Sequence, residues 1–249
     1  MKPTFRTMKK RINFQLLRIG VFIVATAALA RGQGSFVALH SGAADPTSED
    51  FAVTSYGTVQ LGPVYNDLGF DAWSTRLGSG GIYYLDSLPN LSGLSWMLSV
   101  NLRVVEDSLA EPVFSVGMDS GQFGFRLSFG SAANGDPTVV VSGASLSPVL
   151  VLQGAGSTYH NYQLAYDSGL GTAQFWVDGV ERFGNIAGAQ GSSPAVYIAC
   201  SHQIPAALQA NWNSVSVEII PEPSSMALVV LGGVLFGIGL FRKGLLTPS

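Results

Sequence analysis

Cysteine and charged residues are scarce in this sequence of 249 residues, and each scarcity excludes a class of structure. Cys200 is the only cysteine, so no disulfide can form within the chain. Only 12% of the residues are charged, whereas 47% are hydrophobic, which argues against a charge-rich disordered chain and against a coiled coil. An apolar core must therefore stabilise the fold. We expect Cys200 to be a buried strand residue in that core, because it follows the apolar run 196–198.

Lysine is absent from the long middle part of the chain, between residues 31 and 220. This part holds five arginines and fifteen acidic residues, which gives it a formal charge of −10. The other basic residues lie at the two ends: six precede residue 19, and Arg242 and Lys243 lie near the C-terminus. Because such an acidic surface repels phosphate backbones, we predict that nucleic acid is not a partner.

The first 30 residues have the three parts of an export signal. A basic stretch ends at Arg18, and the mostly apolar run Ile19–Ala30 follows it. The run ends in Ala28-Leu29-Ala30, which presents small residues where signal peptidase reads its substrates. We predict a signal peptide over residues 1–30, with signal peptidase as a partner.

A second apolar segment lies near the C-terminus. Residues 226–241 are sixteen uncharged residues, close to the lower limit of about 17 for a membrane-spanning helix. The basic pair Arg242-Lys243 closes the segment, as the positive-inside rule requires. Pro221, Glu222 and Pro223 precede it, and the two prolines keep the backbone extended. We predict a sorting segment over residues 221–249 that contains a transmembrane helix over 226–241.

This order of Pro-Glu-Pro, apolar helix and basic pair resembles the PEP-CTERM sorting signal of Gram-negative bacteria. The resemblance covers about residues 220–243 and implies recognition by an exosortase. The motif residues would be Pro221, Glu222, Pro223, Arg242 and Lys243. It further implies a protein held in the membrane by its C-terminal helix before processing, and then displayed at the cell surface or released outside the cell.

The body between the two ends, residues 31–220, has the pattern of an all-β protein. Short runs rich in Val, Tyr, Phe and Leu alternate with clusters of Gly, Ser, Asn and Asp. Eleven runs are candidate strands, which is about what a two-sheet antiparallel jelly roll requires. They cover residues 51–56, 81–86, 96–105, 112–118, 123–129, 137–143, 149–153, 159–167, 172–179, 195–200 and 213–220.

The stretch Tyr159–Phe183 gives the strongest pattern. Bulky apolar residues such as Tyr162 and Tyr166 alternate with smaller or polar ones, so one face of this strand should be buried. Asp178-Gly179 then provides the positive φ angles that a two-residue hairpin turn needs. We predict two hairpins in series.

This same stretch resembles the LamG and concanavalin A-like family, in which a tyrosine-bearing strand, a short turn and an apolar strand ending in Val-Asp-Gly recur. The resemblance implies a sandwich in which the terminal strand, Ser214–Ile219, pairs back near the start of the body. Lectins, laminin-type adhesion modules and glycoside hydrolases share this fold, so the fold does not decide the function.

Carboxylate spacing bears on whether the chain is an enzyme. A retaining glycosidase needs two carboxyl groups about 5 Å apart. No two acidic residues of this chain are separated by two positions, and the Glu-x-Asp-x-Glu arrangement of the hydrolases with this fold is missing. We therefore predict an exported, non-catalytic surface or matrix protein. The alternative is a polysaccharide-acting glycoside hydrolase whose carboxylates converge from distant strands.

Binding of polysaccharide would require exposed aromatic faces beside polar groups. Trp176, Trp73 and Tyr83 are the candidate ligand-binding residues. Trp176 is a stacking platform if it points outward, opposite the apolar Phe175 and Val177; in the other interpretation it packs against a loop or the second sheet.

We predict no metal site and no cofactor. Calcium is the alternative, because oxygen-rich loops in this fold sometimes bind it. Asp136, Asp167 and Asp178 are the candidate ligands, and all three also stand where turns ordinarily require aspartate. We favour the turn interpretation.

Overall fold

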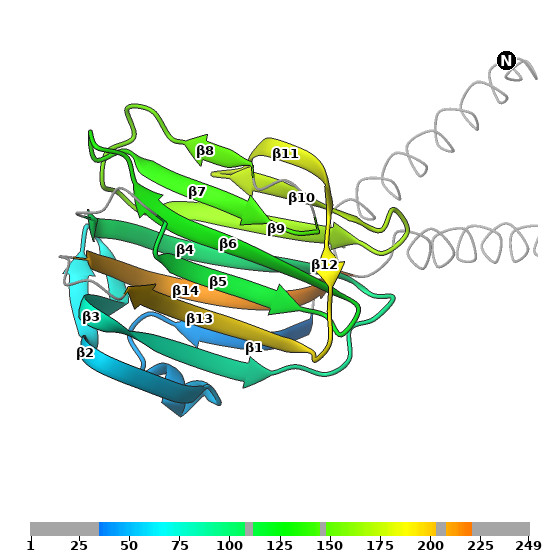
Figure 1. Ribbon diagram of the computed structural model, residues 1–249, viewed down its shortest axis with the longest axis horizontal. Helices are drawn as coiled ribbons and strands as arrows, with labels where there is room; N and C mark the ends of the chain where they lie inside the picture. The colour runs from blue at the N-terminus through cyan, green and yellow to red at the C-terminus, as the bar shows by residue number, and fades with distance from the viewer. Residues whose placement is uncertain (1–34, 108–111, 145–147, 203–207, 221–249) are drawn as a thin grey trace, which may run out of the picture. The chain divides into compact units, whose positions relative to one another are not determined.

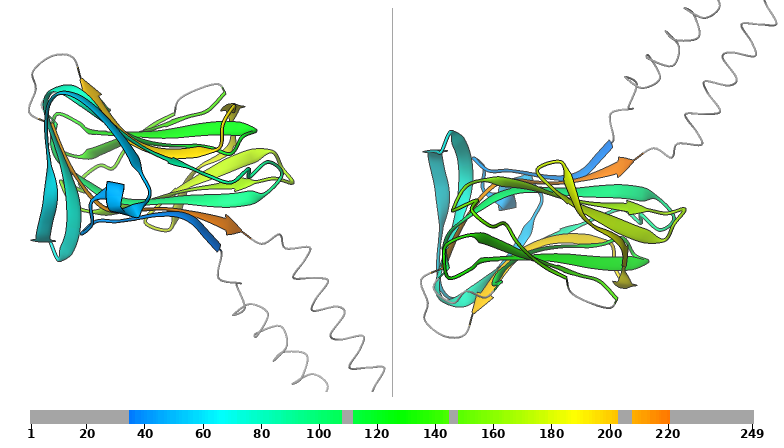
Figure 2. Two further views of the ribbon diagram at one scale, coloured as in Figure 1. Left: turned by 90° about the horizontal axis from the view of Figure 1, so that it is seen from below. Right: turned by 90° about the horizontal axis from the view of Figure 1, so that it is seen from above.

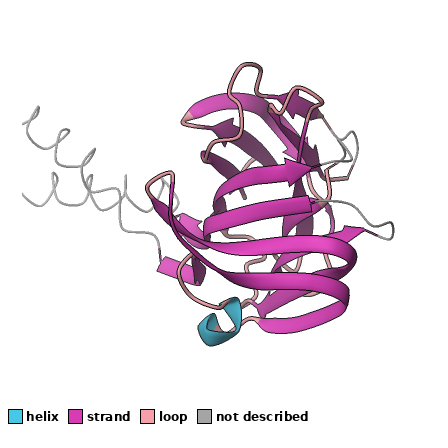
Figure 3. Cartoon of the chain, turned by 90° about the vertical axis from the view of Figure 1, so that its left-hand side faces the viewer, coloured by secondary structure: helices cyan, strands magenta, loops and turns pink. Residues whose placement is uncertain are grey.

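The computed structural model describes residues 35–107, 112–144, 148–202 and 208–220, which form an all-β jelly roll (Figure 1). This confirms the predicted fold class. The described residues form fourteen strands and the 3-10 helix η1, which is cyan in Figure 3. The elements are β1 (Ser35–Ser41), η1 (Pro46–Glu49), β2 (Ala52–Asp67), β3 (Phe70–Ser87), β4 (Ser95–Asp107), β5 (Phe114–Asp119), β6 (Phe123–Ser131), β7 (Pro137–Ser142), β8 (Val149–Val151), β9 (His160–Asp167), β10 (Thr172–Val177), β11 (Val180–Ala187), β12 (Ala189–Gln190), β13 (Ala195–His202) and β14 (Leu208–Ile220).

The strands form one antiparallel sheet that folds over into two layers (Figure 2). The first layer has the order β11-β10-β9-β4-β14-β1, and the second has the order β3-β13-β5-β6-β7-β8. Strand β3 joins the layers, because residues 73–77 pair with β14 and residues 80–87 pair with β13. Strand β2 pairs with β3 along most of its length. We call these two paired strands the β2–β3 ribbon, and β2 is its outer strand.

Glycines allow the β2–β3 ribbon to turn from one layer to the other. Gly57 on β2 lies opposite Gly80 on β3, and both have positive φ angles, of 73° and 132°. A Cβ atom added to Gly80 would lie only 2.1 Å from the carbonyl oxygen of Tyr56. Only glycine fits at such a close backbone approach. The ribbon therefore bends at this glycine pair.

Aromatic side chains from both layers fill the core. The ring of Phe129 on β6 lies 4.9 Å from the ring of Tyr162 on β9 and 6.3 Å from that of Trp212 on β14, measured between centroids. Trp96 on β4 contacts Phe125 on β6 in the same way, at 5.6 Å. All of these side chains are buried. The predicted alternation in the stretch Tyr159–Phe183 is confirmed, because Tyr162, Tyr166, Phe175 and Val177 face this core.

Two predicted connections are also confirmed. Asp178 and Gly179 form the tight turn between β10 and β11, with φ angles of 52° and 77°. The terminal strand β14 pairs back with β1, where Ser35 lies opposite Ile219. The first and last described residues of the sandwich therefore lie at the same end of neighbouring strands.

The prediction missed β1, η1, β12 and most of the β2–β3 ribbon. Strand β2 is exposed along most of its length, so its sequence lacks the alternation that marks a half-buried strand. It also contains Pro63, which an edge strand tolerates and a central strand does not.

Cys200 is buried on β13, as predicted. Burial raises the pKa of its thiol to about 11, so the thiolate is scarce near neutral pH. The residue contributes to packing.

Asp67 anchors the tip of the β2–β3 ribbon to the first layer. Its carboxylate accepts hydrogen bonds from the Arg103 guanidinium at 2.5 Å, the Asn211 amide at 2.7 Å and the Tyr159 hydroxyl at 2.9 Å. Burial alone would raise the pKa of Asp67, but these hydrogen bonds and the charge of Arg103 outweigh burial and lower it.

Asp67→Asn should therefore destabilise the protein in a pH-dependent way. Because the pKa of Asp67 is lowered by folding, its contribution is fully present above the unfolded value of about 4 and is lost as the pH falls through the lower folded value. We expect a loss of about 2 kcal/mol near pH 7 that shrinks below pH 4, measured by urea unfolding. Glu106→Gln, at an exposed ion pair with Arg76, is the control and should change stability by less than about 0.5 kcal/mol. A loss that stayed constant with pH would contradict the assignment.

Candidate functional site

The structure corrects the prediction for Trp73. Its side chain is only 7% exposed, and its indole N–H donates to the hydroxyl of Tyr84 at 3.3 Å. Trp73 lies opposite the buried Trp212 where β3 pairs with β14. It therefore packs the bend between the layers and has no free face for a ligand.

Trp176 and Tyr83 lie on outward faces. Trp176 is half-buried, between Gln163 and Glu181 of the neighbouring strands, on the face opposite the buried Phe175. Tyr83 is 39% exposed and stacks on Tyr197. Of the three candidate aromatic residues, Tyr83 has the largest exposed fraction, and its ligand-binding role stays a prediction.

The sorting residues Pro221, Glu222, Pro223, Arg242 and Lys243 lie outside the described residues, as do the predicted signal peptide and the span 226–241. Within the described part, no helix has the length and apolar character needed to cross a membrane.

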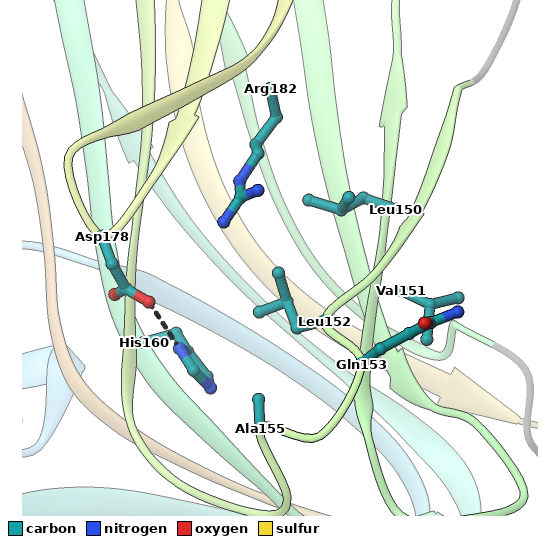
Figure 4. Close-up of a pocket in the computed structure, with 8 residues that line it drawn as sticks. All are labelled: Leu150, Val151, Leu152, Gln153, Ala155, His160, Asp178 and Arg182. Carbon is teal, nitrogen blue, oxygen red and sulfur yellow. Dashed lines mark hydrogen bonds and ion pairs between the residues drawn. The ribbon is translucent and has the colours of Figure 1, made fainter.

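A pocket of about 380 Å³ lies at one end of the sandwich (Figure 4). The segment from β8 to Ala155 forms one wall, and the start of β9 and the β10–β11 hairpin form the other. His160, Asp178 and Arg182 are its charged or titratable residues, and the Arg182 side chain extends into the same space. The remaining lining residues are Leu150, Val151, Leu152, Gln153 and Ala155.

His160 and Asp178 form the polar centre of this pocket. The His160 Nδ1 atom lies 2.7 Å from Asp178 Oδ2, while Asp178 Oδ1 accepts the backbone N–H of Asn161 at 2.9 Å. The backbone N–H of Asp178 donates in turn to the carbonyl of Asn161, also at 2.9 Å. These bonds lock the hairpin turn onto the start of β9. The other nitrogen of His160, Nε2, is buried and has no hydrogen-bond partner among the described residues.

The chemistry open to this pocket is limited by what lines it. A histidine paired with a carboxylate activates a nucleophile through its second nitrogen. The described lining residues include no hydroxyl or thiol side chain, and the Nε2 atom is shielded from solvent. The lining also holds a single carboxylate, that of Asp178, whereas a glycosidase uses two. The hydrogen bonds of the His160–Asp178 pair connect the β10–β11 turn to the start of β9.

The three aspartates considered for calcium serve as turn and loop residues. Asp136 accepts the backbone N–H groups of Gly154 and Gly156, at 2.8 and 3.0 Å, and these bonds lower its pKa. Asp167 accepts those of Gly169 and Leu170 in the β9–β10 turn. Asp178 has the role described above. The turn interpretation of Asp167 and Asp178 is confirmed. In the described ranges, no three His, Cys, Asp or Glu side chains gather as metal ligands would.

Sequence reasoning missed the surroundings of Tyr83. Tyr56 on β2 and Tyr197 on β13 lie on the same outward face of the second layer. The alternation of β3 is enough to place Tyr83 and Tyr84 on opposite faces. The pairing of β2 with β3, and of β13 with both β3 and β5, brings the other tyrosines beside Tyr83, and no local pattern reveals those pairings.

Solved structures with a similar sandwich include a carbohydrate esterase from the Shiga toxin-encoding bacteriophage phi24B. It has 11% sequence identity and a TM-score of 0.56, and the match covers 76% of this chain and all of the other. The binding domain of botulinum neurotoxin serotype D has 11% identity and a TM-score of 0.51 over 80% of this chain, which spans about half (52%) of that domain. At these identities the likeness shows the fold alone, which is consistent with a concanavalin A-like jelly roll.

Comparison with curated protein sequences finds no match. A family model, the PEP-CTERM protein-sorting motif, matches residues 220–243. The match begins at Ile220, the last residue of β14. The predicted resemblance at the C-terminus is thereby confirmed: the chain is a jelly-roll β-sandwich that carries a PEP-CTERM sorting motif directly after the last strand that the structure describes.

Proposed function

We propose that this chain is an exported, non-catalytic module that an exosortase-type system sorts to the cell surface or the extracellular matrix, where it binds polysaccharide. The observation that carries the proposal is the sorting motif at residues 220–243, joined without a spacer to β14.

The roles of the acidic side chains support a non-catalytic function. Many carboxylates of the sandwich accept hydrogen bonds from backbone N–H groups or neighbouring side chains. Glu49 is one example: it accepts from the backbone and hydroxyl of Ser41 and pairs with His40 at 2.6 Å. Carboxylates held in this way stabilise loops and turns.

Polysaccharide is the proposed ligand on two grounds. The similar solved structure of highest TM-score quoted above is that of a carbohydrate esterase. The exposed ring of Tyr83 also provides an amphipathic aromatic face of the kind that sugar rings stack on.

Replacing both Pro221 and Pro223 with alanine tests the sorting. We expect the double variant to accumulate at full length in the membrane fraction, whereas the parent chain loses its C-terminal segment, as followed by immunoblotting after fractionation. Pro89→Ala, at an exposed loop proline, is the matched control and should be processed like the parent. Equal processing of the double variant and the parent would count against exosortase recognition.

The hydrolase alternative needs a separate measurement. We expect the full-length chain, purified in mild detergent, to release no reducing ends from a panel of polysaccharides. Release that is abolished by one Asp or Glu substitution would replace the binding role with a glycoside hydrolase.

A further inference from the structure

The outward face of the second layer carries a row of three tyrosines. Tyr56, Tyr83 and Tyr197 come from β2, β3 and β13, which are neighbours in the sheet. The rings of Tyr83 and Tyr197 are stacked, with centroids 5.3 Å apart and planes inclined by 23°. The Tyr56 side chain is 57% exposed, and its hydroxyl lies 2.6 Å from the Ser201 hydroxyl on β13. We call these three residues the tyrosine strip.

Two of these rings lie over glycines of the neighbouring strands. Tyr56 lies opposite Gly81, and a Cβ atom at Gly81 would lie 2.8 Å from atoms of the Tyr56 ring. Tyr197 lies opposite Gly117, where a Cβ atom would come within 2.0 Å of the ring. Each ring thus covers the space left by a missing side chain, an arrangement that stabilises glycines in strands. The rings are fixed in position before any ligand arrives, which lowers the entropic cost of binding.

The residues beside the strip are small and rich in hydroxyl groups. Thr54, Tyr83, Ala199 and Ser115 lie opposite one another in one row across β2, β3, β13 and β5. Ser201 lies in the next row, beside Gly81. A sugar chain needs aromatic faces beside short polar groups, and this surface offers both.

A positively charged side chain, that of Arg126, lies beyond the Tyr197 end of the strip. Arg126 on β6 lies opposite Gly117 on β5, and Gly117 in turn lies opposite Tyr197 on β13; the Arg126 side chain is exposed. Burial raises the pKa of Tyr197, the charge of Arg126 opposes that rise, and Tyr83 and the Asp119 carboxylate add to it, as expected for neighbours. Among the residues that the structure describes, Arg126 forms no ion pair, unlike Arg76 and Arg103. It is therefore free to pair with an anionic group of a ligand. The formal charge of −10 opposes this pairing less than it opposes nucleic acid, because duplex DNA carries one charge per roughly 1.7 Å of its axis whereas a uronic acid polymer carries one charge per sugar ring.

We propose that the tyrosine strip and Arg126 form a binding site for an acidic polysaccharide, such as a uronic acid polymer, laid across the strands of the second layer. Sugar rings stack on the tyrosines, and a ligand carboxylate pairs with the guanidinium of Arg126, whose planar fork matches a carboxylate. From Tyr56 on β2 to Arg126 on β6 the proposed site crosses five neighbouring strands, roughly 19 Å at the usual strand spacing, so several sugar units are bound at once. The inference rests on the proposed function and names its ligand class.

Affinity gel electrophoresis of the full-length chain in mild detergent tests the site, with sodium polygalacturonate or neutral dextran in the gel. We expect polygalacturonate to retard the parent chain more than dextran does, and added salt to weaken the effect. Tyr83→Ala and Arg126→Gln should each raise the dissociation constant for polygalacturonate by about tenfold. Tyr83→Phe keeps the ring and should bind like the parent.

The chain offers a matched control for each substitution. Tyr65→Ala removes a more exposed tyrosine (67%) of β2 outside the strip, and Arg76→Gln removes an exposed arginine of β3 that pairs with Glu106. Both should bind polygalacturonate like the parent, and near-ultraviolet circular dichroism checks that every variant is folded.

Each of the remaining outcomes of these experiments contradicts one part of the proposal. If the parent binds a polysaccharide and the strip variants bind it equally well, the strip assignment fails and the proposed function stands. Equal binding of dextran and polygalacturonate overturns the acidic class. If no polysaccharide binds, the site and the ligand of the proposed function both fail. A parent dimer that Tyr83→Ala dissociates, measured by sedimentation, would assign the strip to a second copy of the chain.

Discussion

Gly80→Ala is expected to destabilise the protein by at least about 3 kcal/mol, because it acts where the β2–β3 ribbon bends between the layers. The new Cβ atom would lie 2.1 Å from the carbonyl oxygen of Tyr56 and 2.8 Å from the Cα atom of Gly57. These are backbone atoms of a paired strand, so the clash cannot be relieved by rotating a side chain. The φ angle of 132° adds strain, because an alanine rarely adopts it.

Urea unfolding followed by tryptophan fluorescence measures this effect. Gly62→Ala is the matched control: Gly62 lies on the partner strand β2, has no neighbour within 4 Å of its Cβ position and has no positive φ, so the change should be small. Gly80→Ala should also weaken binding by the strip, because Gly80 contacts the backbone of Tyr56. If Gly80→Ala were as stable as Gly62→Ala, the close approach of β2 and β3 would be wrong.

Phe129→Ala is expected to cost about 3–5 kcal/mol of unfolding free energy. Its ring is fully buried on β6 and contacts Tyr162 and Trp212 of the opposite layer, so its removal leaves a cavity between the layers. The core is lined by rigid aromatic rings from several strands, which limits how far it can close around the cavity.

An exposed phenylalanine provides the comparison for this core substitution. Phe36→Ala, at a side chain of β1 that is 56% exposed, should change stability by less than about 0.5 kcal/mol. The ratio of the two losses, obtained from the same denaturation protocol, measures how much of the stability comes from contact between the layers. Losses of similar size at the two positions would contradict the described packing.

The all-β body could be predicted because its strands are half-buried. Alternation of apolar and polar residues, as in the strand that carries Tyr162 and Tyr166, identifies a strand wherever one face meets the core. The turn Asp178-Gly179 was likewise predictable, since few residues adopt its positive φ angles. The sorting motif was readable because it is a linear sequence signal, and the family match at residues 220–243 confirms it.

The candidate site could be predicted only in part. Tyr83 was identified from its residue type and is exposed, but Trp73, identified on the same ground, is buried at the bend. An indole serves equally well as a packing group or as a stacking surface, so residue type does not separate the two roles. Exposure depends on which strands lie beside it.

By itself, therefore, the sequence determined the strand-rich body, its tight β10–β11 turn and the sorting motif, since each depends on residues close together in the chain. Only the tertiary structure decided that Asp67 anchors the ribbon tip, that Phe129 fills the space between the layers, and that Tyr56, Tyr83 and Tyr197 form one surface. These features depend on the register between strands that are as many as 145 residues apart, as Tyr56 and Ser201 are. That register is set by burial across the whole sandwich.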